Sequence, residues 1–275
     1  MNTISNDIDE WVAFLGKAEI PVLRNTAREL RRLQADEEKL SLRGITQVVS
    51  QDPMMVFRIL RYMQQHKREN QLQDLILVEQ AIMMMGMSHF FRDLPPDPTV
   101  DDVMRNDMVA LTHLLKLIRR AHRAAHYSYE WGVMQKDFHV IETRTAALLH
   151  DLAEMLLWCF AADRMMAIFR MQQADKSLRS HIVQMQVLGF KIMDLQLRLI
   201  EHCELPPLLS RLMQDDAMGE QQVRNVTLAV KLARHSANGW DDAALPDDYK
   251  DIADFLRIDT EKVKQIVGAD SGNTA

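Results

Sequence analysis

The sequence contains few of the residues that make tight turns. Nine glycines and eight prolines are spread over 275 residues. A fold of many short strands needs turn residues at a spacing of roughly 8–12 residues, which this composition does not supply. The chain is long enough for a sizeable buried core, and 47% of its residues are apolar. These features favour an all-α fold over a many-stranded β fold.

Only two cysteines are present, Cys159 and Cys203, and both lie in apolar helical patterns. Two buried thiols are typical of a reducing compartment, and no disulfide framework is indicated. The first residues lack a cationic segment followed by an apolar run, so no signal peptide is expected. No run of about 18 apolar residues occurs, so no segment is expected to span a membrane. We therefore expect a cytoplasmic protein.

No block of like charge stands out in the chain. The 33 basic and 39 acidic residues give a formal net charge of −6. Non-specific binding to nucleic acid depends on a basic face or tail, so no nucleic-acid partner is expected. Arg119, Arg120 and Arg123 do cluster on one segment, where a solvated helix face is favoured over a local basic face. Glycine-rich nucleotide loops and Cys-x-x-Cys pairs are absent from the sequence.

Apolar residues recur at helical spacing from one end of the chain to the other. Trp11, Val12 and Leu15, for example, fall on one face of a predicted helix. Asp52-Pro53 is a strong start signal, because proline at the first helical position loses no hydrogen bond. Further helices are predicted at about 100–131, from Glu142 through Leu156, and at about 163–172, 177–187, 192–202 and 221–235.

The proline-rich run Pro95-Pro96-Asp97-Pro98 is the strongest internal boundary of the sequence. We expect a multi-helix bundle in two parts. Residues 1–95 are predicted to form an N-terminal helical subdomain, and residues 99–268 a second helical bundle. Residues 269–275 are expected to form a frayed tail.

Several short segments occur in an order and spacing similar to those of a known family. They are Glu19–Leu23, Gln51–Arg61, Val78–Gly86, Ala147–Leu152, Leu188–Phe190 and Glu204–Pro207. The fourth reads Ala-Leu-Leu-His-Asp-Leu, which is similar to the motif G-L-L-H-D-I-G. Within about residues 16–260 the chain thus resembles the HDOD modules, which are related to the HD phosphohydrolases.

This resemblance implies an HD-like helical bundle for residues 99–268. It also implies a non-catalytic module of bacterial signal transduction that regulates by binding other signalling proteins, and in some cases a small ligand. No cofactor, nucleic acid or membrane is expected as a partner. The oligomeric state stays open.

The HD phosphohydrolases hold a divalent metal through a distant histidine, the adjacent His-Asp pair and a later aspartate. The resemblance places His122, His150 and Asp151 at the first three of these positions. Val230 takes the place of the closing aspartate, and a valine side chain cannot bind a metal. The Gly-Lys that follows the pair in active hydrolases reads Ala153-Glu154 here. We therefore expect no catalytic residues and interpret the His-Asp pair as a relic.

Three alternatives stay open. The chain can be a metal-dependent phosphohydrolase that acts on a nucleotide or cyclic dinucleotide through the His-Asp metal site. It can bind a metal without turnover, through His122 or His126, the pair His150 and Asp151, and a borrowed carboxylate such as Glu154 or Asp194. It can also be a ligand sensor, whose degenerate cleft binds a nucleotide without cleaving it.

Two further groups of residues are candidates for contact with a partner. Arg58, Arg61 and Tyr62 flank an apolar helix and are predicted to form an exposed stripe at the edge of a groove between the two subregions. Met83-Met84-Met85 and Met87 form a local cluster, for which packing in the core is favoured over a partner groove.

Overall fold

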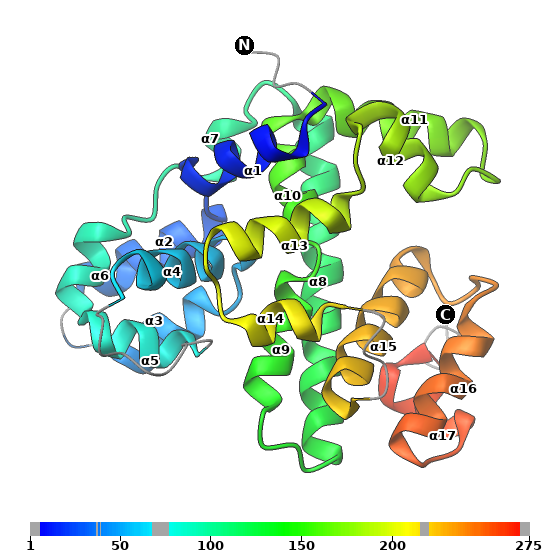
Figure 1. Cartoon of the computed structure of the whole chain (residues 1–275). Coiled ribbons are helices and arrows are strands. Elements are labelled where there is room, and N and C mark those ends of the chain that lie inside the picture. Colours follow the sequence, from blue (N-terminus) through cyan, green and yellow to red (C-terminus); the bar gives the residue numbers. More distant parts are fainter. Residues whose placement is uncertain (1–5, 37, 39, 68–76, 215–219, 270–275) are drawn as a thin grey trace. The chain divides into compact units, whose positions relative to one another are not determined.

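The computed structural model describes residues 6–36, 38, 40–67, 77–214 and 220–269. Within these ranges the regular elements are helices, apart from a one-residue parallel bridge between Val22 and Thr99 (Figure 1). The predicted all-α fold class is therefore confirmed. None of the described helices is both long and apolar enough to cross a membrane.

The chain forms two compact units, and each is built from two separate stretches of sequence. The first unit comprises residues 1–117 and 151–207. Its helices are α1 (Ile8–Lys17), α2 (Arg24–Ala35), α3 (Leu42–Val49), α4 (Pro53–Gln65), α5 (Val78–Met85), α6 (Met87–Asp93), α7 (Val100–Val103), the first part of α8 (Met108–Met134), α10 (Leu152–Phe160), α11 (Ala162–Ala174), α12 (Ser180–Leu188) and α13 (Ile192–His202).

The second unit comprises residues 118–150 and 208–275. Its helices are the remainder of α8, α9 (Val140–Leu149), most of α14 (Pro207–Leu212), α15 (Gln221–His235), the short 3-10 helix η2 (Ser236–Asn238), α16 (Leu245–Leu256) and α17 (Thr260–Val267).

These units do not follow the boundary that the proline-rich run suggests. Residues 95–98 lie inside the first unit. The backbone amide of Val22 donates to the carbonyl of Pro98 at 2.9 Å, and the amide of Val100 donates to the carbonyl of Val22 at 2.9 Å. The run is therefore tied to the start of the chain by backbone hydrogen bonds.

In the first unit, helix α1 packs on α13, and α13 also packs on α10. The predicted apolar face of α1 is buried, with Trp11 2% and Leu15 0% exposed. Burying a side chain of this kind contributes about 1.5–3 kcal/mol. Hydrophobic burial on the predicted face thus fixes the position of α1.

The start of α4 is held by Asp52, as its sequence signal predicts. Oδ1 of Asp52 accepts hydrogen bonds from the amides of Met54 at 3.0 Å and Met55 at 3.1 Å. Oδ2 accepts a third from the amide of Leu23 at 2.7 Å. Complete burial raises the pKa of Asp52, while these hydrogen bonds lower it. One carboxyl group thus caps α4 and anchors the segment before α2.

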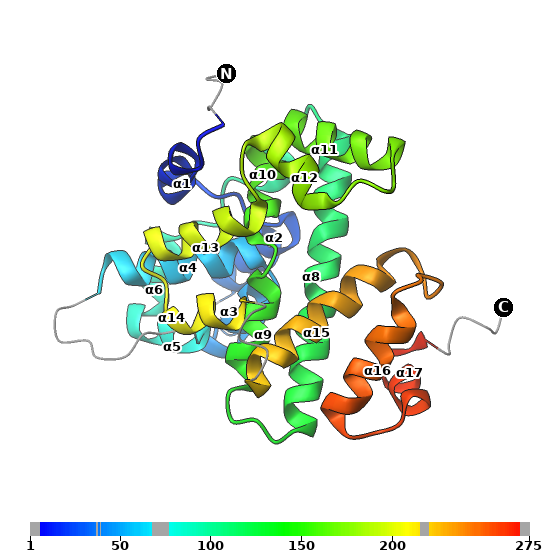
Figure 2. The same ribbon diagram turned by 45° about the vertical axis from the view of Figure 1, so that its right-hand side comes forward.

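In the second unit, α15 packs on α9 and on α16, and α17 packs on α16 (Figures 1 and 2). Gly132 of α8 lies where a side chain would collide, because a Cβ atom there would come within 2.9 Å of Val140 Cγ1. The absence of a side chain lets α8 and α9 approach closely.

Two predicted long helices are interrupted. The pattern at about 100–131 divides into α7 and α8. The pattern from Glu142 through Leu156 divides into α9 and α10 at His150 and Asp151. The apolar spacing continues across both breaks, so the spacing alone does not reveal them.

Candidate functional site

His150 and Asp151 form the turn between α9 and α10. His150 ends α9 with helical backbone angles and is 7% exposed. Asp151 leaves the helical region at φ −104° and ψ 23°, and its carbonyl accepts the first hydrogen bond of α10 from the amide of Met155 at 3.1 Å. The His-Asp pair therefore sits at a helix break with a buried imidazole.

A glutamine from another helix accepts a hydrogen bond from a backbone amide in the first turn of α10. The first amides of a helix have no partner within the helix and are a common site of anion binding. Here the amide of Ala153 donates a 2.6 Å hydrogen bond to Oε1 of Gln196 on α13. Gln196 is 1% exposed. The neutral, buried side chain of Gln196 thus accepts a hydrogen bond from one of the first amides after the His-Asp pair.

The remaining predicted metal ligands have other surroundings. His126 is exposed, and its Nε2 lies 3.5 Å from the carboxylate of Glu130 one turn further along α8. Asp194 is exposed at the beginning of α13, and His122 is half-buried on α8. Among the residues that the structure describes, no group of three or more His, Cys, Asp and Glu side chains could hold a metal ion. The alternative metal site at His122, His150 and Asp151 stays a prediction.

Val230, in the place of the closing aspartate, lies in the apolar part of α15. It is 5% exposed, and its neighbours Leu228 and Ala229 are 1% and 0% exposed. The amide group of Asn225, on the same helix, donates to the carbonyl of Ser128 on α8 at 3.0 Å. Position 230 is thus a packing position, with no atom that can bind a metal.

The prediction that Arg58 belongs to an exposed stripe on α4 is wrong, because Arg58 is only 7% exposed. Its Nη1 donates to the carbonyl of Asp97 at 3.1 Å and its Nη2 to the carbonyl of Pro95 at 2.9 Å. Burial lowers the pKa of Arg58, whereas the nearby charge of Asp52 raises it. Arg58 therefore holds the proline-rich run in place.

Arg61 and Tyr62 are partly buried and also have partners within the first unit. Nη1 of Arg61 donates to the carbonyls of Leu15 and Gly16, each at 3.1 Å, and Nη2 to that of Ala18 at 3.0 Å. The hydroxyl of Tyr62 donates to Asp93 Oδ2 at 2.7 Å. Arg61 thus satisfies the last carbonyls of α1. Partner binding at Arg58, Arg61 and Tyr62 stays a prediction.

The methionine cluster is largely exposed, contrary to the expectation of core packing. Met83, Met84 and Met87 are 61%, 52% and 36% exposed. They lie on α5 and α6, and we call them the methionine patch. Exposed methionines form adaptable apolar surfaces for protein contacts.

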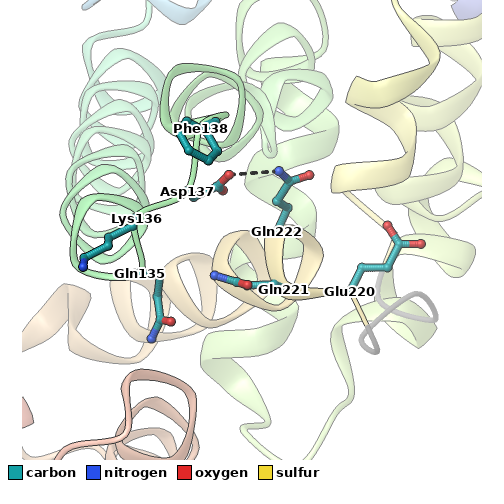
Figure 3. Close-up of a pocket in the computed structure, with 7 residues that line it drawn as sticks. All are labelled: Gln135, Lys136, Asp137, Phe138, Glu220, Gln221 and Gln222. Atoms are coloured by element: carbon teal, nitrogen blue, oxygen red, sulfur yellow. Dashed lines mark hydrogen bonds between the residues drawn. The ribbon is translucent and has the colours of Figure 1, made fainter.

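A pocket lies between the α8–α9 turn and the start of α15, as Figure 3 shows. Its volume is about 270 Å³, and it is lined by Gln135, Lys136, Asp137, Phe138, Glu220, Gln221 and Gln222. The side chain of Asp137 points toward Gln222, whose Nε2 donates to Asp137 Oδ1 at 3.1 Å (Figure 3). The turn and the beginning of α15 are thus joined beside the pocket.

Apolar side chains surround this turn and face solvent. Phe138 is 97% exposed. Tyr129, Val133, Met134 and Ile141 are between 40% and 52% exposed. We call these five residues the tip patch. Neither the tip patch nor the role of Gln196 is predicted from the sequence. The signal for the patch is a phenylalanine in the polar stretch between two predicted helices.

The sequence matches the HDOD domain family over residues 20–217. The chain belongs to this family. The match spans most of the chain, so it confirms the family resemblance that the short motifs indicate. A comparison with curated proteins found no match to the chain.

The solved structures with the same fold include the following two. The MmoQ response regulator of Methylococcus capsulatus strain Bath has a TM-score of 0.64 and 17% identity, over 97% of this chain and 99% of that one. A virulence factor of Campylobacter jejuni subsp. jejuni has a TM-score of 0.66 and 14% identity, over 98% of this chain and 93% of that one. At these identities the similarity establishes the fold alone.

Proposed function

We propose that this HDOD protein is a non-catalytic regulatory module of bacterial signal transduction, which acts in the cytoplasm by binding other proteins. The observation that carries the proposal is Val230. The position corresponding to the closing metal-binding aspartate of the HD phosphohydrolases is a packed valine, 5% exposed, on α15. The loss of that carboxylate removes a ligand that the hydrolase metal site needs.

The surroundings of the His-Asp turn support the same proposal. A phosphate ester in a hydrolase site needs cations and free donors directed at it. After Asp151 the chain has Ala153 and Glu154, so an anionic side chain stands where active relatives have a lysine. The amide of Ala153 is bonded to Gln196 at 2.6 Å. This turn is suited to structural support rather than to phosphate binding.

The methionine patch supports a role in protein binding. Monomeric proteins rarely expose a large contiguous apolar patch, and such a patch often marks a protein-binding surface. Met83 and Met84 are each more than half exposed, at 61% and 52%. A role in signalling also fits the similar structure of MmoQ, which is a response regulator.

The catalytic half of the proposal is tested by hydrolysis assays on the full chain. A cyclic dinucleotide and bis(p-nitrophenyl) phosphate are incubated with the protein and added Mn²⁺ or Fe²⁺, beside the His150→Ala variant. We expect both proteins to give the same background rate. Metal-dependent turnover that disappears in His150→Ala would establish the hydrolase instead.

The binding half is tested by quantitative affinity capture from a bacterial lysate. The bait is the wild-type chain, a Met83→Glu/Met84→Glu variant, or a matched control, Ile182→Glu/Met185→Glu. The control pair is exposed to a similar degree, 49% and 48%, and lies on a different helix, α12. We expect the wild type and the control to enrich the same partner protein equally, and the methionine variant to capture none of it. Equal capture by all three baits would remove the methionine patch from the account.

A further inference from the structure

Methionines are concentrated where α5 meets α6. The chain has 19 methionines in 275 residues, so an average stretch of five residues contains fewer than one. Residues 83–87 contain four, at Met83, Met84, Met85 and Met87. Met83, Met84 and Met87 are 61%, 52% and 36% exposed. Leucine would serve an apolar contact surface equally well, so the repeated use of methionine points to the chemistry of the thioether sulfur.

Gly86 forms the bend that joins the two helices. Its φ of 82° lies in the region that favours glycine. The amide of Gly86 donates to the carbonyl of Ile82 at 2.8 Å, and its carbonyl accepts from the amide of Phe90 at 2.9 Å. Hydrogen bonds thus hold the bend on both sides. The methionines before and after it are therefore carried by one fixed piece of backbone.

The imidazole of His89 lies back over this bend. Its Nδ1 is 3.8 Å from the position that a Cβ atom at residue 86 would occupy. His89 is exposed, as are the methionines on either side of the bend. An imidazole nitrogen is thus placed beside the thioethers, at the point where the chain passes from Met85 to Met87.

The three exposed sulfur atoms are near enough in the chain to converge on one ion. Consecutive Cα atoms are about 3.8 Å apart, so Met83 and Met84 are immediate neighbours, and Met87 follows three residues later. A methionine side chain has three rotatable bonds. Because these three side chains extend into solvent, they can turn toward a shared point without disturbing the core.

This set of donor atoms selects the kind of ion. Thioethers are soft ligands that select Cu(I), and imidazole also suits copper, whereas magnesium, calcium and manganese prefer oxygen ligands. We infer that the methionine patch and His89 together form a binding site for Cu(I). The site uses none of the residues of the His-Asp turn. Its thioethers are neutral, so it holds the ion less tightly than thiolates would, and the metal must be added in a test.

This inference goes beyond the proposed function and can fail separately from it. Replacing the three methionines of the patch by leucine keeps the surface apolar and nearly conserves the side-chain volume, but removes the sulfur. Capture of a partner protein through the apolar surface should survive this change, whereas binding of the metal should not.

Isothermal titration calorimetry of the full chain with Ag(I), a redox-stable substitute for Cu(I), tests the inference. We expect the wild type to bind one equivalent that the variant Met83→Leu/Met84→Leu/Met87→Leu binds at least about tenfold more weakly, since even the loss of an outer-shell contact has an effect of this size. The control Met108→Leu/Met185→Leu removes methionines that are 64% and 48% exposed on α8 and α12, and should bind as the wild type.

The thiols of Cys159 and Cys203 also bind Ag(I), but they are present in all three proteins, so the difference between the proteins measures the methionines. The ligands are identified from the methyl NMR signals of protein labelled with ¹³C at its methionines. Cu(I) added without oxygen should shift the signals of the methionine patch and leave those of Met108 and Met185 in place. Equal binding of Ag(I) by the wild type and the triple leucine variant would overturn the inference, as would patch signals that Cu(I) does not shift.

Discussion

The backbone amide of Ala153 donates a 2.6 Å hydrogen bond to Oε1 of Gln196, across the contact between α10 and α13. Replacing Gln196 by leucine leaves that amide buried without an acceptor. We expect the free energy of unfolding to fall by about 1–3 kcal/mol. Chemical denaturation measures the change. Gln186→Leu, at an exposed position of α12, is the control and should stay within about 0.5 kcal/mol of the wild type. Equal stability of the two variants would show that the amide finds another acceptor.

Arg61 is predicted to stabilise the end of α1. Its guanidinium bonds to three carbonyls, those of Leu15, Gly16 and Ala18, at 3.0–3.1 Å. Arg61→Met should lower the free energy of unfolding by about 1.5–3 kcal/mol, the range for hydrogen bonds with a charged group. Arg61→Lys should recover only part of this, because an ammonium group lacks the planar fork of donors. Thermal unfolding measures these changes. Arg28→Met, at an exposed arginine of α2, is the control and should change the stability little. A fully stable Arg61→Met would contradict the capping role.

His113 is expected to make stability depend on pH. It stacks on Trp158 with 4.9 Å between ring centroids and lies 4.3 Å from the ring of Phe169. Burial, and secondarily Lys116, lowers the pKa of His113 below its ordinary value of 6.5. The unfolded chain therefore takes up this proton first as the pH falls. The contribution of His113 is present above pH 6.5 and is lost between pH 6.5 and its lower folded pKa.

Comparison with His113→Phe isolates this contribution, because the other histidines are present in both proteins. The stability of the wild type should fall more than that of the variant between pH 7.5 and pH 5, as denaturant titrations at each pH measure. Parallel profiles for the two proteins would mean that His113 has the same pKa in the folded and unfolded chains.

Val230→Asp is expected to destabilise the second unit. A carboxylate at a position 5% exposed among apolar side chains loses most of its hydration. The expected loss is about 3 kcal/mol. Val109→Asp, where the valine is 57% exposed, is the control and should change stability little. Thermal unfolding with and without Mn²⁺ measures both. A Val230→Asp protein that is stable and is stabilised further by Mn²⁺ would reveal a metal site completed by one carboxylate.

Helices whose ends carry local signals could be predicted closely. The bounds of α13 (Ile192–His202) and α15 (Gln221–His235) coincide with the predicted ranges, and Asp52-Pro53 starts α4 as expected. The interruptions at Met104–Asp107 and at His150–Asp151 were missed. The first break does carry a local signal, because Oδ1 of Asp107 accepts a hydrogen bond from the amide of Ala110 at 2.9 Å and so caps α8.

The surroundings of the candidate site depend on contacts that are distant in sequence. Arg58 was predicted to be exposed because a single helix gives no sign of the carbonyls of Pro95 and Asp97 that bury it. The hydrogen bond of Gln196 could not be predicted for the same reason, because its partner Ala153 is on another helix. The substitution at Val230, in contrast, could be recognised from sequence, because it replaces a residue type that the chemistry requires.

The central claim is that the His-Asp turn no longer serves a hydrolase. Its most direct test is the metal content of the purified, untagged protein, prepared without chelator and measured by mass spectrometry. The account predicts substoichiometric metal that is unchanged in His150→Ala. Near-stoichiometric iron or manganese that is lost in His150→Ala would contradict it.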